Sequence, residues 1–211
     1  MKVVIFDMDG TLIDSQHDIT VSINHVRRLR YALEPMSSQE VVDAINGPQR
    51  NLAELFYGTK VYHAEDRALF EAHYHEQCIM NPRLYQGIES LLEGLAEEGV
   101  RLSVATNAPS HFAHRMLEHL GVHARFDHIL GADMVEHPKP HREMLTAILA
   151  KYGFGSESDR AWMVGDNAKD MLAAEHAGIP GIFAAWGFSS EGNGDHFARR
   201  PHQVAEIIAK G

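Results

Sequence analysis

Chemically capable side chains stand at the ends of several short apolar runs. The first run ends in Asp7, and Asp9 follows one residue later, before Gly10. The other polar residues in such positions are Thr106, Asn107, Lys139, Asp166 and Asp170. Clustered carboxylates repel one another and raise one another's pKa unless a cation lies among them. Oxygen ligands of this kind suit Mg²⁺, which keeps coordination positions for water and a substrate phosphate.

The residues around these carboxylates fit a phosphoryl group. Lys139 can neutralise the phosphoryl oxygens, while Thr106 and Asn107 can donate hydrogen bonds to them. Gly10 lets the backbone turn tightly and brings N–H groups close to an anion. A carboxylate can serve as the nucleophile toward such a group. The pattern therefore predicts phosphoryl transfer to an aspartate, with Mg²⁺ as the cofactor.

The elements that must position these residues are short strands that alternate with helices. Apolar, strand-like runs cover residues 3–7, 101–106, 128–132, 161–166 and 181–185. Helical patterns fall at 88–98, 111–120, 142–152, 169–177 and 201–210. This alternation predicts an α/β fold with a doubly wound parallel sheet. The carboxyl ends of all its strands would then share one edge, where ligands bind.

One region breaks the alternation. Between Gln16 and Pro82 the sequence shows helical patterns at 19–29, 51–56 and 64–78, and Ser37 to Glu40 resembles a capping box. This segment is too long for a connecting loop. We therefore predict an all-helical domain over 16–82, inserted into a catalytic core made of 1–15 and 83–211.

Four motifs in this order resemble the haloacid dehalogenase superfamily of phosphohydrolases. The first stands here as Asp7-Met8-Asp9-Gly10-Thr11 and the second as Thr106 at the end of a hydrophobic run. The third is Lys139, and the fourth is Gly165-Asp166 with Asp170 four residues on. The resemblance covers essentially the whole chain. It implies a Rossmann-like core and an aspartyl-phosphate mechanism.

The resemblance also implies a role for each motif residue. Asp7 would attack phosphorus, while Asp9 would protonate the leaving oxygen and then activate the hydrolytic water. Mg²⁺ would be held by Asp7, the backbone carbonyl of Asp9, and Asp166. Asp170 would orient the metal's shell or the lysine. The phosphoryl group would be held by Thr106, Asn107 and Lys139.

The position of the inserted segment implies the helical-cap subclass, whose members act on small phosphorylated metabolites. Dehalogenases lack the second aspartate, and the one lysine of the segment, Lys60, lacks the context of a phosphonatase. Enzymes resembling phosphoglycolate phosphatase and mutases resembling β-phosphoglucomutase remain, and Trp186-Gly187-Phe188 slightly favours the phosphatase. The stretch from Ile45 to Leu52 resembles the specificity loop of both, where Arg50 could contact substrate or could be an exposed loop residue. The physiological substrate stays open.

Composition limits the other possibilities. The formal net charge of −10 argues against a nucleic-acid or anionic-membrane partner. A single cysteine, Cys78, excludes an internal disulfide and suits the cytoplasm. The sequence shows neither an apolar run of membrane-spanning length nor a signal peptide. Monomer and homodimer both remain possible.

Two further interpretations stay open at this level. A phospho-accepting receiver domain also places acids, Thr and Lys on a parallel sheet, although the large insertion fits it poorly. The fifteen histidines suggest a transition-metal site. Most of them are predicted to be solvated surface residues, because His111 and His114 could share a helix face but lack a third partner, and two prolines interrupt the stretch between His137 and His141.

Overall fold

The computed structural model describes residues 1–47 and 51–211, so Arg50, predicted to lie in the cap, is outside the described residues. The chain divides into two compact units. One consists of Met1–Asp14 and Leu84–Gly211, and the other is Ser15–Arg83. We call the first the core unit and the second the helical unit. The role of the helical unit as a cap stays a prediction.

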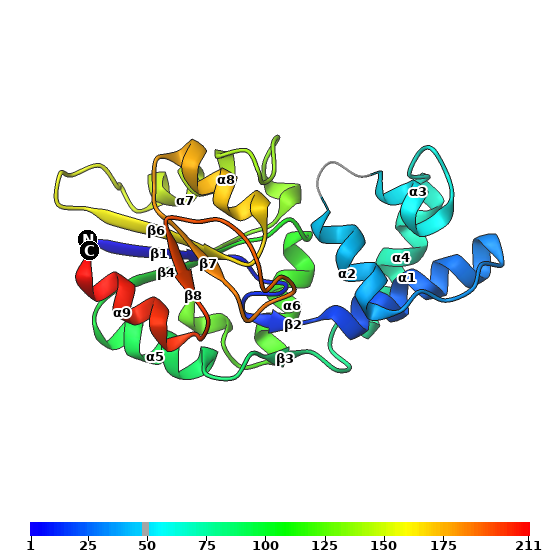
Figure 1. The fold of residues 1–211 in the computed structure, drawn as a ribbon, viewed down its shortest axis with the longest axis horizontal. Coiled ribbons are helices and arrows are strands. Elements are labelled where there is room, and N and C mark those ends of the chain that lie inside the picture. The colour runs from blue at the N-terminus through cyan, green and yellow to red at the C-terminus, as the bar shows by residue number, and fades with distance from the viewer. Residues whose placement is uncertain (48–50) are drawn as a thin grey trace. The chain divides into compact units, whose positions relative to one another are not determined.

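A six-stranded parallel sheet forms the centre of the core unit (Figure 1). The strand order is β5-β4-β1-β6-β7-β8, which confirms the predicted doubly wound α/β fold. The strands are β1 (Lys2–Phe6), β4 (Arg101–Ala105), β5 (His128–Leu130), β6 (Arg160–Gly165), β7 (Gly181–Ala184) and β8 (His196–Ala198). Residues 3–6 of the central strand β1 are fully buried, as expected for a strand covered on both faces.

Helices cover both faces of this sheet. The core helices are α5 (Ile88–Glu97), α6 (Ser110–His119), α7 (Glu143–Lys151), α8 (Ala168–Ala177) and α9 (His202–Lys210), with short 3₁₀ turns η1 (His123–Arg125) and η2 (Ala132–Met134). Helices α7 and α8 lie on one face, and α5 and α9 on the other (Figure 1). Alternate β1 residues Val3 and Ile5 pack in one cluster with Met144 of α7 and Ala173 of α8.

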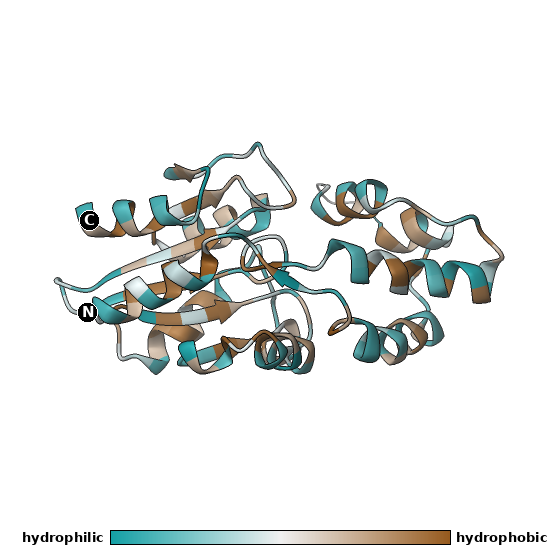
Figure 2. Cartoon of the chain, turned by 90° about the horizontal axis from the view of Figure 1, so that it is seen from below, coloured by the Kyte–Doolittle hydropathy of each residue, from teal (hydrophilic) through white to brown (hydrophobic). Residues whose placement is uncertain are grey.

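The helical unit contains α1 (Gln16–Tyr31), α2 (Ser38–Asn46), α3 (Leu52–Tyr57) and α4 (Ala64–Gln77). Ser37 and Glu40 form the predicted capping box at the start of α2. Polar and apolar residues alternate along these helices (Figure 2). Their apolar sides form a separate small core that includes Ile23, Val26 and Phe56. Each unit therefore has its own buried apolar cluster.

The chain leaves and re-enters the core unit through a small two-stranded sheet. Its strands are β2 (Ile13–Asp14) and β3 (Arg83–Leu84). The backbone N–H of Tyr85 also donates to the carbonyl of Leu12, 3.1 Å away. None of the described helices is long and apolar enough to cross a membrane.

Candidate active site

The register of three neighbouring strands brings the predicted residues to one edge of the sheet. Phe6 at the end of β1 pairs with Val104 of β4 and with Val164 of β6. Asp7 continues this alignment, because its N–H donates to the Val164 carbonyl over 2.8 Å. Thr106 and Asp166 each follow the last residue of their strand. Residues far apart in the sequence are therefore neighbours at the carboxyl edge.

Three buried carboxylates form the centre of this edge. Oxygen atoms of Asp7, Asp166 and Asp170 all lie within 4.8 Å of one another. Each of the three residues is less than one-tenth exposed. Three anionic groups so close together need positive charge among them. Their oxygen-only donor set suits a hard divalent cation.

Lys139 supplies part of that positive charge. Its Nζ donates to Asp7 Oδ1 over 2.7 Å and to Asp170 Oδ1 over 2.6 Å, and its side chain is 2% exposed. Burial alone would lower the pKa of Lys139, but the charges and hydrogen bonds of Asp170 and Asp7 raise it above its usual value. The lysine is therefore held in its charged form between two carboxylates.

A single ammonium group does not balance three carboxylates. Burial, followed by the charges of Asp7 and Asp170, raises the pKa of Asp166 well above its usual value, although hydrogen bonds from Phe188 N–H and the Thr11 hydroxyl oppose this. Burial and the charge of Asp7 likewise raise the pKa of Asp170 to about 6, against the opposing effect of Lys139. Both shifts indicate a site that would gain from a further cation.

The loop that carries Lys139 is tied to the end of β4 by Asn107. The Asn107 side chain donates to the Lys139 carbonyl over 2.8 Å and accepts from the Lys139 N–H over 3.0 Å. The Thr106 hydroxyl, which is buried, accepts from the N–H of Ala108 over 3.1 Å. The structure thus brings both residues to the predicted edge, and the side chain of Asn107 positions the lysine.

Asp170 has two functions, one for each carboxylate oxygen. Its Oδ1 accepts from Lys139, and its Oδ2 accepts from the N–H of Asn167 over 3.1 Å. The second contact belongs to a capping box that starts helix α8. A methyl group on Gly165 would lie 2.4 Å from the Asp170 side chain, so the motif needs a glycine at this position.

The turn after β1, which contains Asp9, passes close to Asp166 at Gly10. The carbonyl of Met8 accepts from the N–H groups of Thr11, Leu12 and Ile13, which closes the turn. Gly10 has a φ of 82°, and a Cβ there would lie 2.4 Å from Asp166 Oδ2. Asp9 is partly exposed and lies outside the three-carboxylate group.

The segment 186–188 is a part of the site whose contacts the sequence does not predict. The indole N–H of Trp186 donates to the Thr11 carbonyl over 2.9 Å, and the N–H of Phe188 donates to Asp166 Oδ2 over 2.8 Å. Gly187 packs so closely that a Cβ would lie 1.9 Å from the Gly10 carbonyl oxygen. Among the motif residues, Thr11 also gains a partner, because its hydroxyl donates to Asp166 Oδ1 over 3.2 Å.

The comparison with known families agrees with this geometry. Residues 4–184 match the sequence profile of the haloacid dehalogenase-like hydrolases. The chain belongs to the haloacid dehalogenase-like hydrolase family. Its relatives within that family include phosphatases, and it is an enzyme of this class.

Alignments with relatives of this hydrolase cover nearly the whole chain. It is 31% identical to an N-acetylmuramic acid 6-phosphate phosphatase from Pseudomonas aeruginosa, over 99% of this chain and 95% of that protein. It is 33% identical to a phosphoglycolate phosphatase from Rhodospirillum rubrum, over 90% of this chain and 82% of that protein. A crystal structure of a predicted phosphoglycolate phosphatase from Haemophilus somnus shares the fold, with a TM-score of 0.83 at 24% identity, covering 98% of this chain and 97% of that one.

Proposed function

We propose that this hydrolase is a Mg²⁺-dependent phosphatase that removes phosphate from a small metabolite through an aspartyl-phosphate intermediate. The observation that carries the proposal is the contact of Asp7 with Lys139 inside a buried carboxylate group. Asp7 lies at the end of the central strand, and a cationic side chain is already placed beside its carboxylate. A phosphoryl group bound there would meet a nucleophile and a neutralising charge together.

The residues present fit Mg²⁺. Asp7, Asp166 and the Asp9 carbonyl would hold it, and the ion would offset the burial and the neighbouring charges of Asp7 and Asp170 that raise the pKa of Asp166. Hydrogen bonds from Thr11 and Phe188 fix the orientation of the Asp166 carboxylate. When bound, Mg²⁺ would stabilise negative charge on the phosphoryl oxygens.

In the first half-reaction, the Asp7 carboxylate attacks phosphorus and an acyl-phosphate bond forms. The ester P–O bond breaks as Asp9 gives its proton to the leaving alcohol oxygen. In the second half-reaction, Asp9 takes a proton from a water molecule that attacks the same phosphorus. The bond to Asp7 then breaks, and inorganic phosphate leaves. Lys139 and the Thr106 hydroxyl hold the phosphoryl oxygens in both steps, while Asn107 and Asp170 keep the lysine in place.

The chemistry shared by the substrates that name the two relatives supports a substrate class. Phosphoglycolate and N-acetylmuramic acid 6-phosphate are both phosphate monoesters that also carry a carboxylate. We therefore propose a small phosphate monoester with a carboxylate as the substrate. The helical unit would act as a cap that recognises its non-reacting part, and Arg50 would bind the carboxylate. A cytoplasmic location and the choice between monomer and homodimer stay predictions.

Phosphate release from a panel of monoesters tests this proposal. We expect turnover of carboxylate-bearing esters with Mg²⁺ and loss of turnover after chelation. Asp7→Asn should abolish turnover, and Asp9→Asn should slow it roughly 10²–10⁴-fold. Asp127→Asn, outside the motifs and directly before β5, is the matched control and should remain active. Turnover that survives in Asp7→Asn would rule out the covalent route, and a product that keeps its phosphate would indicate a phosphotransferase.

A further inference from the structure

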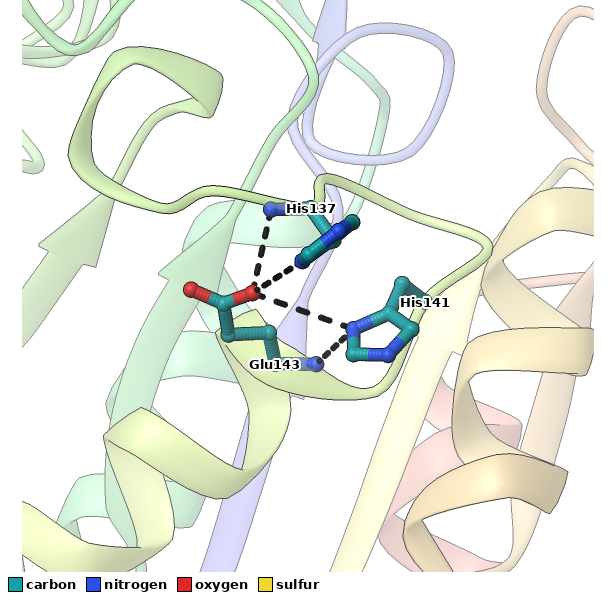
Figure 3. Close-up of side chains that lie close together, drawn as sticks. All are labelled: His137, His141 and Glu143. Carbon is teal, nitrogen blue, oxygen red and sulfur yellow. Dashed lines mark hydrogen bonds and ion pairs between the residues drawn. The ribbon is translucent and has the colours of Figure 1, made fainter.

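A second group of possible metal ligands lies on the loop that carries Lys139 and at the start of the following helix. His137 and His141 lie on either side of Lys139, and Glu143 is the first residue of α7 (Figure 3). The two histidines are exposed and Glu143 is partly buried. Although two prolines separate the histidines in sequence, their ring centroids lie 4.8 Å apart. The loop therefore places the two imidazoles and the carboxylate together.

The distances are close to those of a transition-metal site. Glu143 Oε2 lies 3.1 Å from His137 Nδ1 and 3.9 Å from His141 Nδ1. One ligand atom from each residue lies within 4.8 Å of both others. In a tetrahedral zinc site with bonds of about 2.1 Å, ligand atoms are separated by about 3.4 Å. The two separations from the carboxylate oxygen lie on either side of this value, and the two imidazole ligand atoms lie within 4.8 Å of each other.

The carboxylate of this group is already fixed in position. Glu143 Oε1 accepts from the N–H of Glu136 over 2.9 Å, and Oε2 accepts from the N–H of His137 over 3.0 Å. The N–H of Glu143 donates to His141 Nδ1 over 3.3 Å, which places a nitrogen lone pair on the side of the cluster. A metal ion would replace this long contact. Ligands held by other hydrogen bonds lose less freedom on binding a metal.

We propose that His137, His141 and Glu143 form a second metal site, which binds a divalent transition ion such as Zn²⁺. Two imidazoles and one carboxylate suit Zn²⁺ or Cu²⁺, whereas the all-oxygen group at Asp7 suits Mg²⁺. The ion would link the backbone on both sides of Lys139 to the start of α7. Asn107 already holds the Lys139 backbone from β4, so the ion would complete the anchoring of the loop.

Metal titration with substituted variants tests this site. Zn²⁺ affinity would be measured by calorimetry in excess Mg²⁺, and Cu²⁺ would serve as an electron paramagnetic resonance probe of ligand type. We expect nitrogen hyperfine coupling from imidazole in the wild type. The variants His137→Gln and His141→Gln should each reduce that coupling from two imidazoles to one and bind Zn²⁺ at least about 10-fold more weakly, since even outer ligand partners are worth that much.

The matched control is His202→Gln. His202 is as exposed as His137 and lies 4.0 Å from Glu206, but this pair belongs to no three-ligand group among the described residues. We expect this variant to bind both ions as the wild type does. Absence of nitrogen coupling in the wild type, or wild-type affinity and coupling in either loop variant, overturns the proposal. Because ligand type and affinity are read directly, this test is independent of phosphatase activity.

Discussion

Replacing Lys139 by methionine tests how the buried charges of the site are balanced. Methionine keeps an unbranched side chain of similar length but removes the ammonium group, which leaves Asp7 and Asp170 without the cation 2.7 Å and 2.6 Å away. Removing one partner of a buried ion pair typically destabilises a protein by about 3–5 kcal/mol. The carboxylates that remain can escape this penalty by binding protons.

The cost of this proton uptake sets an upper limit on the loss in the free energy of unfolding, and the limit depends on pH. A carboxyl group with an unfolded-state pKa of about 3.9 takes up a proton at a cost of about 1.4 kcal/mol per pH unit above that value. The limit for one carboxylate is therefore about 4 kcal/mol at pH 7 and about 1.5 kcal/mol at pH 5. Lys139 opposes the rise in the pKa of Asp170, so without it the folded-state pKa of Asp170 moves further above the unfolded value, and stability is lost as pH rises between the two values.

We therefore expect Lys139→Met to lower the free energy of unfolding by about 3–4 kcal/mol at pH 7 and by no more than about 1.5 kcal/mol at pH 5. Urea unfolding in the presence of a chelator would measure this. The two tryptophans, Trp162 and Trp186, both belong to the core unit, so their fluorescence reports on that unit alone. Lys151→Met, at an exposed position at the end of α7, is the control. A loss that is the same at both pH values would refute this account of the charge balance.

Two further predictions concern the same edge of the sheet. Gly187→Ala should sharply reduce phosphatase activity, because the added Cβ would lie 1.9 Å from the Gly10 carbonyl oxygen. The control Gly155→Ala, whose Cβ would meet open space, should remain active. Equal activity of the two variants would show that the 186–188 segment can shift freely. Mg²⁺ affinity measured by calorimetry should fall between pH 7.5 and pH 5.5, since a proton competes with the ion for Asp166, whose pKa is raised well above its usual value by burial and by the charges of Asp7 and Asp170. Affinity that is independent of pH in this range would contradict metal binding at these carboxylates.

The central strands and most of the site could be predicted from local sequence patterns. Strands buried on both faces appear as continuous apolar runs, and the capping box at Ser37 is a short-range signal. Strand β8 (His196–Ala198) was not predicted, because it is a short strand at the sheet edge and Phe197 is 41% exposed. Such a strand has no apolar run to mark it.

The contacts that join the site residues were not predicted, because they link residues distant in sequence. Lys139 was predicted as a site residue, but its contact with Asp7 forms only when the sheet brings the two residues together. The bond from Trp186 to Thr11 joins residues that are 175 positions apart, and no local pattern records it. Asp170, predicted as a site residue, also takes part in the capping box at the start of α8, and the structure alone reveals this second contact.

The pairing of β2 with β3 has a consequence for how this chain could have acquired its helical unit. Asp14 and Leu84, the core residues that border the unit, lie on neighbouring strands of one small sheet. A segment whose two ends are attached side by side can be shortened, lengthened or exchanged while the order of the six main strands stays the same. The carboxylates and Lys139 all belong to the other unit, so such an exchange leaves the chemistry in place. With the role in substrate recognition that we propose for the helical unit, the fold would separate the part of the gene that can diverge toward new substrates from the part that must keep its geometry.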